Sequence, residues 1–252
     1  MKTLQQRIEH ANADGRIACI PFVTAGFPDI ERFFAVLSDL DANGADIIEI
    51  GVPFSDPVAD GPVVEEASRR ALAQGVSLTW LLEKLRLLPT FRAGLVLMGY
   101  YNPFLQYGLE RLARDAAKAG IHGCIVPDLP LDEDGPLRAA LSARALDLIP
   151  LVAPNTTDER MREYAASAAG YVYVTSVMGT TGMRQALPEA AETVRRARAV
   201  FSIPVALGFG ISSPEQVASM PVRPHAAVFG SALLRHLDAG GSAGDFMRAW
   251  RG

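Results

Sequence analysis

Residues 46–62 read DIIEIGVPFSDPVADGP, and this stretch contains the unit from which the fold is built. Its first part, Asp46–Ile50, is a short apolar run that is typical of a buried strand. The second part, Gly51–Pro62, is a connection that leads into an amphipathic, helical pattern. A buried strand followed by a helix is the repeating unit of a parallel sheet that is covered by helices.

The same unit recurs from one end of the chain to the other. The candidate strands are Ile17–Val23, Asp46–Ile50, Gly94–Met98, Gly123–Val126, Leu146–Val152, Tyr171–Thr175, Val205–Leu207 and Ala226–Phe229. The candidate helices between them include Ile30–Ala42, Leu78–Leu88, Leu109–Ala119, Pro136–Arg144, Asp158–Ala168, Pro188–Ala199 and Pro214–Met220. This α/β pattern predicts a closed (β/α)8 barrel, a TIM barrel, with an extra N-terminal helix near Leu4–Ala13. We expect residues 1–252 to form this barrel as a single domain. An open doubly wound sheet fits less well, because no Gly-x-Gly-x-x-Gly motif follows the first strand.

Composition excludes several classes of protein. A net charge of −4 argues against a nucleic-acid partner or an anionic membrane surface. No window approaches the roughly 18 apolar residues of a membrane helix, and we expect no signal peptide at Met1. Cys19 and Cys124 both fall in predicted buried strands. We therefore expect free thiols and a cytoplasmic location.

The residues that could carry chemistry are mainly carboxylates. All three lysines lie in predicted helices rather than at strand ends, which argues against a Schiff-base mechanism. The four histidines show no spacing typical of metal ligands, so we expect no metal site. No Gly-x-Ser-x-Gly motif indicates a serine hydrolase.

Two connections that follow strands are unusually long, and active sites of such barrels lie on these connections. Gly51–Pro62 and Ser176–Leu187 both exceed the usual length of about two to six residues. Connections of this length are typical of lids and binding loops, although a harmless insertion is an alternative reading of each.

Glu49 is the strongest catalytic candidate, because it lies one residue from the end of an otherwise apolar strand. Burial raises the pKa of a carboxyl group, as a general acid or base near neutral pH requires. A structural carboxylate that accepts bonds from a neighbouring loop is the alternative. Asp60 lies in the loop that follows and can reach the same end of the barrel, unless it only forms an Asx turn. Tyr173 could present its hydroxyl to Glu49 or fill the barrel.

Glycines after the last two strands indicate a phosphate site. Gly210 lies in a glycine-rich turn just before a helix that begins with Ser213 and Pro214, and Gly230-Ser231 opens another short helix. Helix N-termini with free N–H groups bind anions, and barrels commonly bind phosphate on these two loops. Together with Thr181-Gly182 in the loop after the sixth predicted strand, these glycines predict a phosphate ester as the ligand.

Five segments resemble tryptophan synthase α subunits: Pro21–Gly26, Glu49–Pro62, Met98–Pro103, Val126–Pro130 and Gly208–Glu215. The resemblance runs from the first predicted strand to the eighth, and the second segment is long enough to be specific. It implies a lyase that splits indole-3-glycerol phosphate into indole and glyceraldehyde 3-phosphate in tryptophan biosynthesis.

The resemblance also implies roles for individual residues. Glu49 would protonate indole C3 and take the proton of the glycerol hydroxyl, Asp60 would hydrogen-bond the indole N–H, and Tyr173 would position Glu49. The indole pocket would consist of Phe22, Met98, Tyr100, Ile125, Thr181 and Phe209. The phosphate would be held by Gly182, Gly210, Gly230 and Ser231. A pyridoxal-phosphate-bearing β subunit would complete an α2β2 heterotetramer and would meet Pro53, Asp56, Asn102, Pro130 and Gly179. No cofactor is expected on this chain itself.

The sequence departs from the pattern of these relatives in the sixth loop. Val177 stands where many relatives carry an arginine, and Arg184 is the candidate to replace some of that charge. Three alternatives stay open: a stand-alone indole-releasing lyase, a non-catalytic activating subunit of the β chain, and another sugar-phosphate barrel such as an isomerase. The last would not explain the loop at 51–62, and intact Glu49 and Asp60 argue against the activating subunit.

Overall fold

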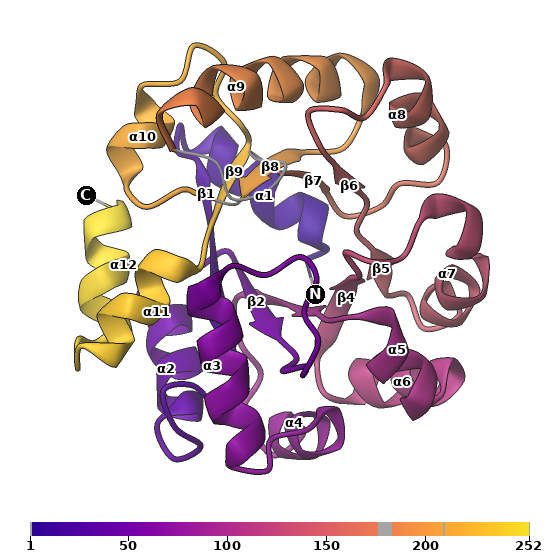
Figure 1. The fold of residues 1–252 in the computed structure, drawn as a ribbon. Helices are drawn as coiled ribbons and strands as arrows, with labels where there is room; N and C mark the ends of the chain where they lie inside the picture. Colours follow the sequence, from indigo (N-terminus) through magenta and orange to yellow (C-terminus); the bar gives the residue numbers. More distant parts are fainter. Residues whose placement is uncertain (1, 176–182, 209, 252) are drawn as a thin grey trace.

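The computed structural model describes residues 2–175, 183–208 and 210–251, with the side chains of 183–188 left out. Parallel strands surround the centre of the molecule and helices cover them from outside (Figure 1). The strands are β1 (Ala18–Thr24), β2 (Ile47–Gly51), β3 (Gly94–Met98), β4 (Ile121–Ile125), β5 (Asp147–Leu148), β6 (Leu151–Val152), β7 (Val172–Thr175), β8 (Val205–Gly208) and β9 (Ala226–Phe229). The helices are α1 (Leu4–Ala13), α2 (Phe33–Ala42), α3 (Pro62–Ala73), α4 (Leu78–Leu85), α5 (Tyr101–Tyr107), α6 (Leu109–Lys118), η1 (Leu131–Glu133), α7 (Gly135–Ser142), α8 (Asp158–Ala165), α9 (Met183–Val200), α10 (Pro214–Ala218), α11 (Ser231–Asp238) and α12 (Ala243–Arg251).

The sheet runs β5-β4-β3-β2-β1-β9-β8-β7-β6, with every neighbouring pair parallel. Its two ends, β5 and β6, are the two halves of the single strand predicted at Leu146–Val152. That prediction needs a correction, because Pro150 has no N–H to donate and interrupts the strand. Ile149 N still donates to Cys124 O at 2.9 Å, and Tyr173 N donates to Pro150 O at 2.9 Å. The segment therefore pairs with both neighbours, and the predicted barrel is confirmed.

The extra helix α1 has the bounds expected from the sequence. Thr3 and Gln6 form a capping box at its start, and Leu4 and Ile8 are among its buried residues. A Cβ on Gly94, the first residue of β3, would lie 2.7 Å from Leu4 Cδ2. Because β3 begins at Gly94, α1 packs against the amino-terminal end of the barrel and leaves the carboxyl-terminal end accessible for a site.

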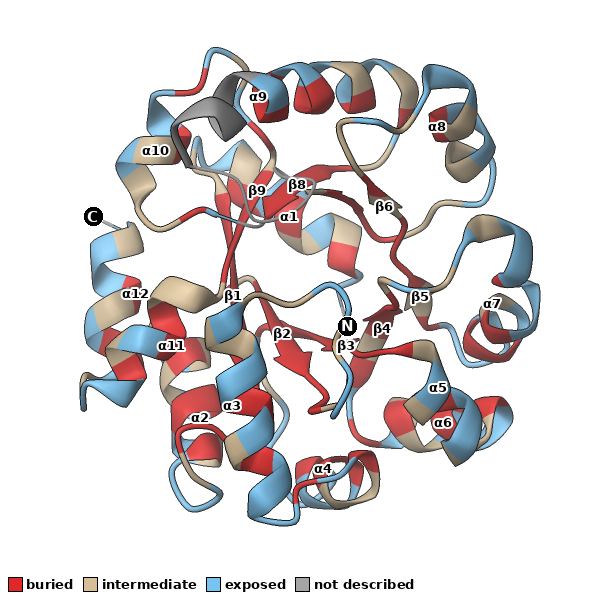
Figure 2. Cartoon of the chain, in the orientation of Figure 1, coloured by how far each residue is buried: buried red, intermediate tan, exposed pale blue. Residues whose placement is uncertain are grey.

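Burial follows the layers of the barrel. Figure 2 shows strands that are mostly buried, whereas most of the helices have buried and exposed residues side by side. Every residue of β2 is buried, including the carboxylate Glu49. The apolar runs of the sequence are thus strands covered on both faces, as predicted.

The helix α9 begins at Met183, which is earlier than the predicted start at Pro188. Proline favours the first turn of a helix, so it suggested a boundary that the chain does not use. The connection between β7 and α9 is therefore shorter than the predicted connection Ser176–Leu187.

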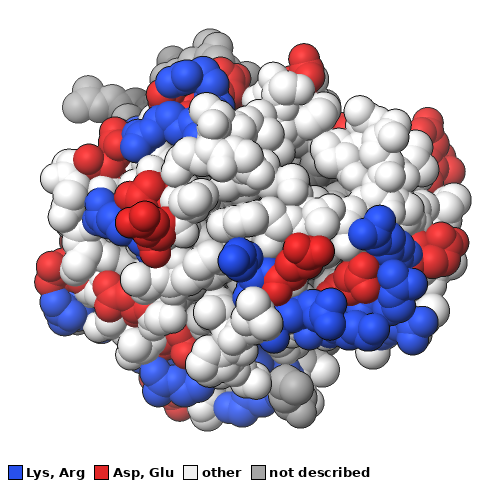
Figure 3. All heavy atoms as spheres, turned by 90° about the horizontal axis from the view of Figure 1, so that it is seen from below, with Lys and Arg blue, Asp and Glu red and all other residues white. Residues whose placement is uncertain are grey.

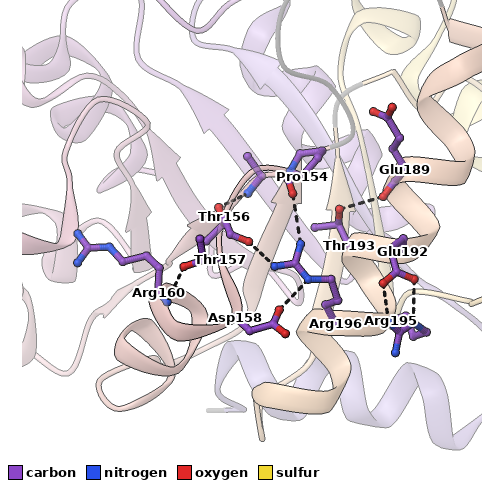
Figure 4. A network of polar contacts seen from close by, with 11 residues as sticks. Pro154, Thr156, Thr157, Asp158, Arg160, Glu189, Glu192, Thr193, Arg195 and Arg196 are labelled. Carbon is purple, nitrogen blue, oxygen red and sulfur yellow. Dashed lines mark hydrogen bonds and ion pairs between the residues drawn. The ribbon is translucent and has the colours of Figure 1, made fainter.

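The middle of α9 is fixed to the connection between β6 and α8. Arg196 Nε pairs with Asp158 at 2.7 Å, and its guanidinium also donates to Pro154 O at 3.2 Å and to Thr156 O (Figure 4). Thr157 caps α8 by accepting a bond from Arg160 N at 3.2 Å. Arg196 therefore holds the start of α8, at the carboxyl-terminal side of β6, against α9.

Charges of both signs are mixed on the surface. On the face in Figure 3, the main group of Lys and Arg side chains is interleaved with Asp and Glu side chains. Across the described part of the chain, no helix is both long and apolar enough to cross a membrane.

Candidate active site

A cavity of about 240 Å³ lies at the carboxyl-terminal end of the barrel. Its lining comes from β1, β3, β7 and β9, from the connection after β2 and the start of α3, and from the segments after β8 and β9. Seven residues predicted for the site line it together: Phe22, Asp60, Met98, Tyr173, Gly210, Gly230 and Ser231. The sequence did not indicate the other lining residues, Val64, Ile211, Ser212, Val228, Ala232 and Arg235.

Glu49 lies just below this cavity and is fully buried. Its neighbour in register on β1 is Phe22, which lines the cavity. Burial raises the pKa of Glu49 from 4.5 to about 8, and a hydrogen bond from Tyr171 partly opposes this rise. Oε2 of Glu49 has no hydrogen-bond partner among the described residues. A pKa of about 8 means that the protonated form predominates at pH 7, and Oε2 is left for another molecule.

The hydroxyl that contacts Glu49 belongs to Tyr171, which donates to Oε1 at 2.7 Å. Sequence reasoning had selected Tyr173, two residues further along the chain. Tyr173 does lie nearby: burial raises its pKa, and the charges of Glu49 and Asp60 raise it further. Side chains alternate between the two faces of a strand, so Tyr171 and Tyr173 point to the same face. Only the geometry of the barrel then decides which of the two hydroxyls reaches Glu49.

Asp60 reaches the cavity from the connection between β2 and α3. Burial raises its pKa from 3.8 to about 6, the hydrogen bond from Tyr100 lowers it, and the charge of Glu65 raises it. The hydroxyl of Tyr100 also accepts a bond from Ala59 N at 3.0 Å. Tyr100, predicted for the indole pocket, thus holds the loop that carries Asp60 and packs against Phe54 with ring centroids 5.3 Å apart.

The two predicted phosphate loops differ in their free N–H groups. In the loop before α10, Ser212 N and Ser213 N both donate to Gln216 Oε1, at 2.7 and 3.1 Å. At the start of α11, Gly230 makes no side-chain cap, and Ser231 N and Ala232 N have no hydrogen-bond partner among the described residues. The start of α11 is therefore the better anion site of the two.

The remaining predicted pocket residues divide into two groups. Ile125 is buried at the end of β4 and does not line the cavity. Thr181, Gly182 and Phe209 lie outside the described residues, and so does Gly179 of the predicted interface. Asp128, which follows β4, accepts a bond at 2.9 Å from the N–H of Tyr101, the first residue of α5.

The predicted interface residues follow β2, β3 and β4 at this same end of the barrel. Asp56, Asn102 and Pro130 are exposed, whereas Pro53 is buried within the chain. Val58, on the same loop as Asp56, is 81% exposed. Within the described residues, no group of three or more His, Cys, Asp or Glu could hold a metal ion.

Comparisons with known proteins agree with one another. The family model described as tryptophan synthase alpha chain matches residues 8–246. The tryptophan synthase alpha chain of Nitratidesulfovibrio vulgaris is 66% identical over 98% of this chain and 97% of its own length. That of Desulfovibrio desulfuricans is 61% identical, with 100% of both chains covered.

Solved structures give the same result. A chain from the structure of Mycobacterium tuberculosis tryptophan synthase is 37% identical with a TM-score of 0.88, covering 99% of this chain and 98% of that chain. The tryptophan synthase subunit alpha of Legionella pneumophila is 31% identical with a TM-score of 0.87, covering 100% and 97%. The chain therefore belongs to the tryptophan synthase alpha chain family.

Proposed function

We propose that Glu49 and Asp60 carry out the reaction of the family, the cleavage of indole-3-glycerol phosphate into indole and glyceraldehyde 3-phosphate. One observation carries this assignment. A fully buried carboxyl group with a pKa of about 8 lies below a cavity, and a second carboxylate lines the same cavity. The reaction needs no cofactor on this chain, because pyridoxal phosphate belongs to the β subunit.

Glu49 acts first as an acid. At neutral pH it holds its proton and gives it to C3 of the indole ring, which leaves the ring as an indolenine cation. The resulting carboxylate then takes the proton of the hydroxyl on the carbon that is bonded to C3. The carbon–carbon bond breaks, its electron pair returns to the ring, and indole and an aldehyde are released. A pKa near the working pH suits a group that must both give and take a proton.

Asp60 stabilises the cation that forms between these two steps. Its carboxylate accepts a hydrogen bond from the ring N–H, and its negative charge offsets the positive charge of the indolenine. The hydroxyl of Tyr100 supports this role, because it keeps the pKa of Asp60 lower than burial alone would. Tyr171 holds Oε1 of Glu49 and so turns Oε2 toward the ring.

Two substitutions test the catalytic assignment. Glu49→Gln should lower turnover by at least about 10²–10⁴-fold, because an amide cannot transfer the proton. Asp60→Asn should lower turnover as well, while both variants still bind the substrate. Indole release is the measurement, and Glu133→Gln on the exposed η1 is a matched control that should keep the wild-type rate. Near-wild-type turnover in both active-site variants would remove these residues from the reaction.

We also propose that the loop between β2 and α3 joins catalysis to the β subunit. This chain works as the α subunit of an α2β2 complex, and the exposed Asp56 shares its loop with the catalytic Asp60. Ordering such a loop costs conformational entropy, which a bound partner can offset. A titration with a β subunit should accelerate indole release severalfold. A fast basal rate that ignores the β subunit would favour the stand-alone lyase instead.

Two further expectations remain proposals. A cytoplasmic location is supported by Cys19 and Cys124, which are buried free thiols of the kind found in reducing compartments. A single domain over residues 1–252 is supported by the hydrophobic core, in which Leu4 of α1 and Met247 of α12 belong to one cluster with the barrel strands.

A further inference from the structure

Arg235 lies on α11 and lines the same cavity as Asp60. Among the described residues of the lining, it is the only Lys or Arg, and Asp60 is the only Asp or Glu. The cavity therefore contains one positive and one negative side chain. The resemblance to relatives gave Arg235 no role, and the glycine pattern of the sequence did not indicate it.

The position of Arg235 on its helix directs it toward the predicted phosphate site. It lies one turn after Ser231, the first residue of α11. Side chains of a helix lean toward its N-terminus, which directs the exposed side chain of Arg235 toward the first turn. There the N–H groups of Ser231 and Ala232 have no partner among the described residues. A cation and two free N–H donors thus point to one place.

The guanidinium of Arg235 is also not used elsewhere. It makes no hydrogen bond or ion pair with any described residue, and its helix is tied to α3 by another pair, Arg70 with Asp238. Burial, Tyr100 and Glu65 set the pKa of Asp60, and Arg235 is not among these causes. Asp60 follows β2 and Arg235 follows β9, and β1 lies between these two strands in the sheet, so the two charges enter the cavity from different elements.

We infer that Arg235 binds the phosphate of the substrate and, with Asp60 on a different element, fixes the direction in which the substrate lies. This inference rests on the proposed function and names the charged group of its phosphate site. A phosphate dianion at the start of α11 receives N–H bonds from the backbone, and the guanidinium supplies the matching charge. The cationic intermediate then forms at Asp60, away from the arginine. With Val177 in place of the arginine of many relatives, Arg235 is the cation that the described cavity offers.

Arg235→Gln tests this role in the intact chain, with and without a β subunit. The KM for indole-3-glycerol phosphate and the inhibition constant of glycerol 3-phosphate should both rise by about tenfold or more, as expected for a lost charge-assisted hydrogen bond. Turnover at saturation should change much less, and binding of phosphate-free indole should not change. Arg235→Lys should recover part of the affinity, because lysine keeps the charge without the planar fork.

A matched control and a second variant separate the possible failures. Arg144→Gln removes an exposed arginine outside the cavity and should leave every constant unchanged. Gly210→Val tests the phosphate site itself. If Gly210→Val weakens glycerol 3-phosphate and Arg235→Gln does not, the role of Arg235 is wrong and the site stands. If glycerol 3-phosphate does not compete with the substrate in the wild type, the phosphate site is wrong and the inference falls with it.

Discussion

Replacing Glu49 by Gln should make the protein more stable than the wild type, and increasingly so as the pH rises from 5 to 8. Burial raises the pKa of Glu49 from 4.5 to about 8 in the folded chain. In the unfolded chain the carboxyl group loses its proton near the ordinary value. Between these two values folding must take up a proton, so the stability that Glu49 contributes is complete below pH 4.5 and is lost as the pH approaches 8.

The size of this loss follows from the pKa shift. Each pKa unit corresponds to about 1.4 kcal/mol. A shift from 4.5 to about 8 therefore gives an upper value of roughly 5 kcal/mol at pH 8 and above. Gln carries no titrating proton and avoids the loss, and its amide oxygen can still accept the bond from Tyr171. We expect the variant and the wild type to be similar at pH 5 and to differ by about 2–5 kcal/mol at pH 8.5.

Urea unfolding followed by circular dichroism at pH 5, 7 and 8.5 measures the difference. Glu66→Gln is a suitable control, because Glu66 is exposed and Arg69 lowers its pKa, so its replacement should bring no gain as the pH rises. Parallel stability curves for Glu49→Gln and the wild type would refute the reasoning. They would mean that Glu49 is ionised in the folded protein at neutral pH, and its proposed role as an acid would fail with it.

Other predictions concern activity. The profile of kcat/KM against pH should have an acid limb near 6, where Asp60 must lose its proton, and an alkaline limb near 8, where Glu49 must keep its own; a flat profile over this range would contradict both assignments. Tyr171→Phe removes the bond that lowers the pKa of Glu49, so the alkaline limb should move to higher pH, and a limb that stays in place would exclude this positioning role. Gly210→Val should raise KM far more than it lowers kcat, because Gly210 borders the phosphate site and has a φ of 84°, which favours glycine. A dephosphorylated analogue should bind the wild type and this variant equally weakly. Asp56→Ala should lose most of the acceleration by a β subunit and keep the basal rate, and an unchanged titration curve would remove Asp56 from the interface.

Elements that depend on a single continuous pattern could be predicted from the sequence. The bounds of α1, β3 and β9 agree with the prediction, because an amphipathic or apolar run with clear ends defines each of them. The fifth strand could not be predicted in detail. Its apolar run continues through Pro150 without a break. Only the pairing of β5 with β4 and of β6 with β7 shows that the strand divides there.

The site was predictable as a set of loops, but not as a set of contacts. Glu49 stood out as a charge in an apolar strand, and Asp60 as an acid in a long loop. Tyr171 and Arg235 did not stand out, since both depend on how elements far apart in sequence meet. The stagger of strands around the barrel decides which tyrosine reaches Glu49. The packing of α11 at the end of the barrel brings Arg235 to the cavity.

The division of the fifth predicted strand also affects where the sheet opens locally and how its exposed strand edges avoid aggregation. The ladders from β4 to β5 and from β6 to β7 hold only two residue pairs each, against five between β2 and β3. Local opening is easiest where few bonds must break, so we expect backbone amides beside this junction to exchange with solvent sooner than those of β2. Each opening exposes strand edges that could pair with another molecule. Asp147 lies in β5 and is partly buried, so its carboxyl group becomes hydrated when the junction opens. A charge on such an edge opposes pairing between chains, so we expect Asp147 to disfavour aggregation at this junction, where the ladders are as short as the one from β8 to β9.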